Sequence, residues 1–129
     1  MEYLVHLGFR EEPRDLGVYL VRKGFAIDEN YEEPGEKVYK SQNGEMFWYF
    51  ERMEYMGIDS GERMDKYWSK VAPGVSIASE AEIRLGPEFV NKEKDLEKLV
   101  TLGKIFRDEL NALLTVQEAY TDNIELILD

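Results

Sequence analysis

The side chains of this sequence that can perform acid–base chemistry are one histidine and many carboxylates. His6 is the only histidine, and the chain has no cysteine. A serine–histidine–aspartate relay needs all three residue types close together, and Asp59 and Ser60 supply the other two. Aspartate and serine are also preferred N-terminal caps of helices, and we expect that role for both. We expect His6 to lie on a partly exposed strand face, and we predict no catalytic residue.

The sequence shows no recognised pattern of metal ligands or phosphate-binding glycines. Zinc sites are built mainly from cysteine and histidine, of which this chain has only His6. Residues 28–33 are rich in oxygen ligands, but they lack the glycine and the closing glutamate of a calcium-binding loop. The glycines do not form a phosphate-binding or dinucleotide-binding motif. We therefore predict neither a metal nor a cofactor.

Two pairs of closely spaced carboxylates have the residue type required for general acid–base catalysis. Glu51 and Glu54 follow an aromatic run, and Glu80 and Glu82 share one face of a predicted strand. Such pairs act as acid and base only when their environments separate their pKa values. Because 33% of the residues are charged, we interpret both pairs as solvated. An enzyme that uses carboxylates in a cleft near the two tryptophans is our third hypothesis.

The negative charge is concentrated in two segments. The chain has 27 acidic and 16 basic side chains, which gives a formal net charge of −11. Residues 28–36 carry five acids and residues 108–129 carry six, with no lysine or arginine in either segment. These two acidic zones account for the whole net charge. They disfavour nucleic acid and anionic membranes as direct partners, and they favour a basic protein partner. The alternative is that they serve only solubility.

Length and composition are typical of one folded domain over residues 1–129. A chain of this length with 43% hydrophobic residues can bury a sizeable core. Aromatic residues make up 12% of the chain, which argues against disorder. The N-terminus has no basic region typical of a signal peptide, and no apolar stretch is long enough to span a bilayer. With the lack of cysteine, these features lead us to expect a cytoplasmic protein.

Hydrophobic periodicity predicts strands and helices in mixed order. Asn43-Gly44 is a preferred hairpin turn, and the spacing of Leu99, Phe106 and Leu110 predicts a helix with one buried face. A strand over residues 17–22 is an alternative to the first helix. The expected strands cover residues 2–9, 25–28, 37–42, 45–55, 75–85, 112–120 and 124–128, with a turn over 121–123, and the expected helices cover 13–24, 62–71 and 92–110.

The irregular alternation of these elements predicts an α+β fold rather than a doubly wound sheet. We expect a mixed or antiparallel sheet of about five to seven strands, packed against two or three helices. A strand–helix–strand unit near each end, with hairpin strands between, suggests a ferredoxin-like or related sandwich.

The aromatic strand over residues 46–50 is apolar on both faces, so both faces need a cover. The helices of the domain supply one cover. A second subunit or an apolar ligand can supply the other, and a homodimeric structural or ligand-binding domain is therefore our second hypothesis. The residues predicted for such an interface or ligand site are Trp48, Phe50 and Trp68.

Our first hypothesis is a protein-binding module that docks its acidic zones on a basic partner. Each zone also holds a tyrosine, a residue that is enriched at the energetic centres of interfaces. In size and acidity the chain is similar to small cytoplasmic immunity proteins and phage-encoded inhibitors, which suggests a nuclease toxin as the kind of partner. The predicted contact residues are Tyr31, Glu32, Glu33, Glu36, Glu118, Tyr120 and Asp122.

Overall fold

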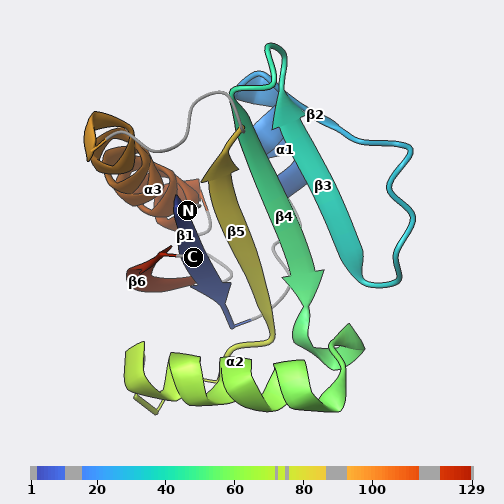
Figure 1. The fold of residues 1–129 in the computed structure, drawn as a ribbon, viewed down its shortest axis with the longest axis vertical. Helices are drawn as coiled ribbons and strands as arrows, with labels where there is room; N and C mark the ends of the chain where they lie inside the picture. Colours follow the sequence, from blue (N-terminus) through green and yellow to red (C-terminus); the bar gives the residue numbers. More distant parts are fainter. Residues whose placement is uncertain are drawn as a thin grey trace.

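The computed structural model describes residues 3–10, 16–71, 73–74, 76–86, 93–113 and 120–128. Figure 1 shows the arrangement of its strands and helices. None of these helices is both long enough and apolar enough to cross a membrane. The strands are β1 (Tyr3–Phe9), β2 (Phe25–Ile27), β3 (Glu36–Ser41), β4 (Met46–Arg52), β5 (Ser79–Leu85) and β6 (Tyr120–Leu128), and the helices are α1 (Leu16–Arg22), the 3₁₀ helix η1 (Met53–Tyr55), α2 (Ile58–Val71) and α3 (Glu93–Leu113).

The six strands form one sheet in the order β2-β3-β4-β5-β1-β6, and every neighbouring pair is antiparallel. With α1 and α3, the strands β1, β4, β5 and β6 follow the β-α-β-β-α-β order of a ferredoxin-like sandwich. The hairpin of β2 and β3 extends this unit at one edge, and α2 is inserted between β4 and β5. The predicted α+β fold, with an antiparallel sheet packed against helices, is confirmed.

One face of the sheet packs against α1 and α3 to form the core. Trp48 lies at its centre with no exposed surface, and its ring meets the edges of Phe25 and Phe106 at centroid distances of 6.3 and 5.1 Å. Such edge-to-face contacts add to the stabilisation from buried area. The buried face of α3 is the predicted one, because Leu99, Phe106 and Leu110 all belong to the core.

Helix α3 is also fastened to α1 by a polar contact at the edge of the core. The hydroxyl of Tyr19 donates a hydrogen bond of 3.0 Å to Glu109, and the ammonium of Lys23 lies 2.6 Å from the other oxygen of that carboxylate. The hydrogen bond from Lys23 is the main cause that lowers the pKa of Glu109. One acid of the second acidic zone therefore has an internal partner.

Helix α2 lies on the opposite face of the sheet and crosses one end of it (Figure 1). Its buried residue is Trp68, whose ring lies against the backbone of Gly8 in β1. A Cβ atom at position 8 would come within 2.8 Å of this ring. Glycine at this position therefore gives the indole the space to reach the sheet.

A hairpin at the predicted position is confirmed, but its loop covers residues 42–45 and not only Asn43-Gly44, with a backbone hydrogen bond of 3.0 Å from Gly44 to Ser41. The predicted end of its second strand is also wrong. The pairing of Lys40 with Phe47 centres the hairpin on Asn43-Gly44, and Gly44 adopts a positive φ of 71°. β4 ends at Arg52, where residues 53–55 turn into η1.

Further boundaries also differ from the predictions. β5 begins at Ser79, so residues 76–78 of the predicted strand 75–85 are not part of it. α3 continues to Leu113, three residues beyond its predicted end at Leu110, so residues 112 and 113 are helical and not the start of the predicted strand 112–120; residues 114–119 lie outside the described residues. β6 runs through the predicted turn at 121–123, since pairing with β1 overrides the local turn preference, with a register shift between Leu7 and Phe9. α2 begins at Ile58, so Asp59 and Ser60 lie inside its first turn and do not cap it.

We predict that Gly8→Ala destabilises the protein by about 1–3 kcal/mol, the usual cost of overpacking a filled site. The new methyl group must displace the buried Trp68 ring. Gly61→Ala is the matched control, because its Cβ meets nothing closer than 4.0 Å and alanine within a helix is favoured over glycine by about 0.5–1 kcal/mol. Urea unfolding of both variants measures the difference. Equal effects on the free energy of unfolding would contradict the packing described here.

Candidate functional site

The face of the sheet opposite the core carries two rows of side chains across neighbouring strands. In the first row Glu36 lies opposite Glu51, and Glu51 lies opposite Glu80. In the second row Tyr49 lies opposite Glu82, and Glu82 lies opposite His6. Directly opposed residues have Cβ atoms about 4.5–5.5 Å apart, so the two rows form one continuous surface. We call this surface, made of Glu36, Tyr49, Glu51, Glu80, Glu82 and His6, the acidic face.

At the outer end of the acidic face, two tyrosines flank Glu36 and Glu51. The hydroxyl of Tyr31 donates a 2.8 Å hydrogen bond to Glu36, and this bond is the main cause that raises the pKa of Tyr31 to about 12. The rings of Tyr31 and Tyr49 meet edge to face at a centroid distance of 6.2 Å. The carboxyl of Glu36 is therefore oriented by a neighbour from the loop between β2 and β3.

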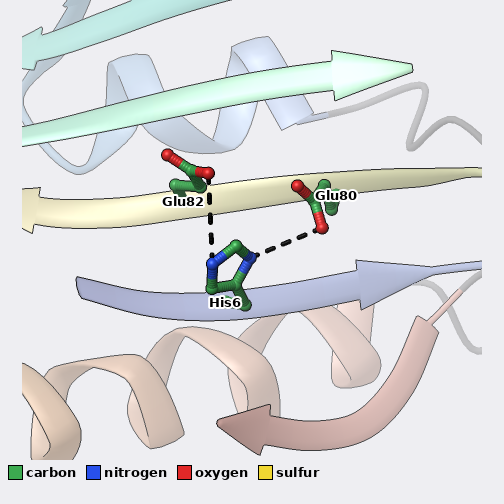
Figure 2. Close-up of side chains that lie close together, drawn as sticks. All are labelled: His6, Glu80 and Glu82. Atoms are coloured by element: carbon green, nitrogen blue, oxygen red, sulfur yellow. Dashed lines mark ion pairs between the residues drawn. The ribbon is translucent and has the colours of Figure 1, made fainter. Parts of the chain in front are cut away.

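At the inner end, α2 covers Glu80 and His6, each of which is only 2% exposed. The indole Nε1 of Trp68 donates a 2.9 Å hydrogen bond to Oε2 of Glu80. Figure 2 shows the imidazole of His6 between two carboxylates, with Nδ1 3.4 Å from Oε2 of Glu80 and Nε2 4.0 Å from Oε1 of Glu82. The ring of Tyr67 lies 5.4 Å from the imidazole.

Between the two ends lies a cavity of about 100 Å³, lined by Glu36, Tyr49, Phe50, Glu51, Glu80 and Glu82. Arg84 borders this region: its guanidinium lies 2.5 Å from Glu82 and 4.7 Å from the centre of the Tyr49 ring. Drug-sized ligands occupy pockets of about 300–1,000 Å³. The cavity is therefore suited to a small charged group, such as an ion or the end of a side chain.

Burial, together with the neighbouring carboxylates, raises the pKa of Glu51 from 4.5 to about 7. Burial is the largest cause, followed by the hydrogen bond with Glu36 and by repulsion from Glu36, Glu80 and Glu82. At neutral pH the carboxyl of Glu51 therefore exchanges its proton readily. Chemically, the acidic face can hold a cation, and it can take up or release a proton near pH 7.

The structure separates the residues predicted for the binding module. Tyr31 and Glu36 belong to the outer end of the acidic face, whereas Glu32 and Glu33 are exposed in the neighbouring loop. Glu118 lies outside the described residues. Tyr120 and Asp122 lie on β6 at the edge of the sheet opposite β2. These two residues therefore lie at the sheet edge opposite the first acidic zone, whereas Asp108 and Glu109 of the second zone lie on α3.

The three apolar residues predicted for an interface or ligand do not share a surface. Trp48 and Phe50 point into the core, while Trp68 packs on the other face. One cleft between the two tryptophans is therefore ruled out by the sheet that separates them. The predictions that Glu80 is solvated and that His6 lies on a partly exposed face are wrong, because α2 covers both side chains. The sequence feature that could have indicated this burial is a single histidine in one apolar strand and two glutamates in another.

We predict that Glu51→Gln stabilises the protein more at pH 8 than at pH 5. The folded-state pKa of Glu51 is raised above its ordinary value, so the wild type loses stability as pH rises from about 4.5 to 7 and Glu51 ionises among its neighbours. Glutamine cannot ionise, and the variant escapes this loss. Thermal unfolding at both pH values measures the effect. Glu32→Gln on the exposed loop is the control, and the same pH dependence in both variants would contradict the assignment.

The chain was compared with protein-family models, with curated proteins and with solved structures, and none of them matches it. The functional argument therefore depends on the residues of the acidic face and on their geometry. In the structure, carboxylates from β3, β4 and β5 meet at one small cavity, which the sequence alone did not indicate. His6 of β1 lies near two of them, at the inner end of the acidic face.

Proposed function

We propose that this chain is a binding protein whose acidic face accepts a positively charged side chain of a protein partner. The observation that carries this proposal is the row Glu36–Glu51–Glu80, in which like charges lie directly opposite one another on three adjacent strands. Like charges at such positions destabilise a sheet. A cation that binds between these carboxylates would relieve their repulsion, and this would explain why a row that destabilises the free protein is present.

The described side chains leave part of this row without a cation. Arg84 pairs with Glu82, but within the described ranges neither Glu36 nor Glu51 forms an ion pair with a basic residue. A lysine or arginine from a partner would lie close to both carboxylates. Partly buried pairs of this kind interact more strongly than exposed ones, because they are less screened by water and salt.

The surroundings of the row also suit a protein partner. The cavity has room for an ammonium or guanidinium group with a few waters. Tyr31 and Tyr49 stand beside it and are half-buried, and tyrosine contributes large contact areas at interfaces. The exposed Glu32 and Glu33 lie in the adjacent loop and add to the negative field that attracts a basic partner.

Proteins that bind nucleic acid carry clusters of lysine and arginine for phosphate groups. A row of carboxylates is complementary to such a cluster. A nuclease is therefore the class of partner that we propose, and an inhibitor or immunity-type role follows when the carboxylates occupy its phosphate-binding surface. We do not propose a dimer or an apolar ligand site on residues 46–50, because Trp48 and Phe50 already pack in the core.

We predict that a labelled peptide of six arginines binds the wild type about tenfold more tightly than the double variant Glu36→Gln/Glu51→Gln. This factor corresponds to the loss of one charge-assisted hydrogen bond at the low end of its usual range, about 1.5 kcal/mol. Fluorescence anisotropy at low salt measures the dissociation constants. Because Glu51 titrates near pH 7, binding to the wild type is expected to be tighter at pH 8 than at pH 6.

Two control variants remove the same charge elsewhere. Glu97→Gln/Asp108→Asn changes exposed positions of α3, and Glu32→Gln/Glu33→Gln changes the exposed loop. Both should weaken binding only slightly and to the extent expected from net charge. If the α3 variant loses as much affinity as the acidic-face variant, binding reflects overall charge and the proposal is wrong. If only the loop variant loses affinity, the partner site lies on the loop and not in the cavity.

A further inference from the structure

The inner end of the acidic face holds a buried imidazole whose Nδ1 has no hydrogen-bond partner. His6 is 2% exposed, and its Nδ1 makes no hydrogen bond although Oε2 of Glu80 lies 3.4 Å away. Its Nε2 lies 4.0 Å from Glu82, which is also too far for a hydrogen bond. Buried polar atoms normally have partners. The ring therefore lies at ion-pair distance from two carboxylates without a hydrogen bond to either (Figure 2).

The carboxylate of Glu80 is held in position from outside this cluster. Trp68 Nε1 donates to its Oε2, and the indole reaches that position only because residue 8 is a glycine. Outer hydrogen bonds of this kind orient the carboxylate ligands of metal ions in proteins. The fold thus positions one carboxylate beside the histidine before any ligand arrives.

The charge balance of the cluster is unfavourable without a further cation. Glu80 is 2% exposed and has one indole N–H as its hydrogen-bond donor, and a buried carboxylate is costly unless it is paired or bound to a metal. Glu82 of the same strand adds negative charge, as do Glu36 of β3 and Glu51 of β4. Arg84 pairs with Glu82. A divalent ion would compensate the buried charge directly.

We propose that His6, Glu80 and Glu82 bind one divalent first-row transition-metal ion. One ligand atom from each residue lies within 4.8 Å of the others. Because metal–nitrogen and metal–oxygen bonds are about 2.0–2.2 Å long, ligand atoms on one ion are at most about 4.4 Å apart, and small side-chain rotations bring the three into range. This proposal does not depend on the binding of a protein partner.

The ligand types determine which ions fit. One imidazole with two carboxylates suits zinc, cobalt and manganese, whereas magnesium and calcium prefer oxygen ligands alone. For a given set of such ligands, affinity rises from manganese through cobalt to zinc or copper. The carboxylate of Glu82 is 28% exposed and borders the cavity, so water can complete the coordination from that side.

The test is calorimetric titration of the full chain, freed of metal with a chelator, with zinc, cobalt and manganese chlorides. We expect one saturable site, with affinity increasing from manganese to zinc and no competition from equimolar magnesium or calcium. His6→Gln should weaken zinc binding by more than the 10–100-fold typical for loss of an outer-shell partner. Glu82→Gln removes a partly exposed ligand and should weaken binding without loss of fold, as checked by circular dichroism.

Glu36→Gln is the matched control, since it removes one charge from the same face but leaves the three ligands intact. Nitrogen NMR of His6 gives a second measurement, because zinc should shift the resonance of one ring nitrogen selectively. The proposal is overturned if none of the three ions binds with one-to-one stoichiometry, or if His6→Gln binds zinc as tightly as the wild type and the Glu36→Gln control do. It is also overturned if both ring nitrogens stay protonated at saturating zinc, since His6 is then a cation that bridges the two glutamates.

Discussion

The hydrogen bond from Trp68 to Glu80 is the interaction on which the second face of the sheet depends. It joins α2 to the central strand β5, and it is possible because Gly8 leaves room for the indole. By covering Glu80 and His6, α2 buries a carboxylate and an imidazole that would otherwise face water. The low exposure of these groups then increases the repulsion felt by Glu51, since charges interact more strongly away from solvent.

The residues on the two faces of the sheet contribute differently to stability. On the core face, periodicity, packing and aromatic contacts all favour the same structure, as expected for a sequence selected for stability. On the acidic face, Glu36, Glu51 and Glu80 oppose one another and destabilise the pairing of β3, β4 and β5. Positions whose residues reduce the stability of the fold often belong to functional sites. This contrast is the reason why we locate binding on the acidic face and not on the aromatic strand.

Much of the fold could be predicted from the sequence, because periodicity and the Asn43-Gly44 turn report local structure. That turn also implies the pairing of Glu36 with Glu51, since both are equally distant from its centre. The meeting of these acids with Glu80 and His6 could not be predicted, because it depends on the order of β4, β5 and β1 in the sheet. The burial of His6 depends in addition on where α2 docks. The turn expected at Asp122-Asn123 was overridden by pairing with β1, a long-range effect that a local preference does not report.

The proposed function requires that the glutamates of β3, β4 and β5 form one electrostatically coupled row. A pH titration of side-chain carboxyl carbons by NMR, with Glu51 assigned by substitution, measures this coupling. If the row is coupled, Glu51 titrates with a midpoint near 7, and with a lower midpoint in the variant Glu80→Gln, in which one neighbouring charge is absent. A midpoint close to the ordinary value of 4.5, unchanged by Glu80→Gln, would contradict it.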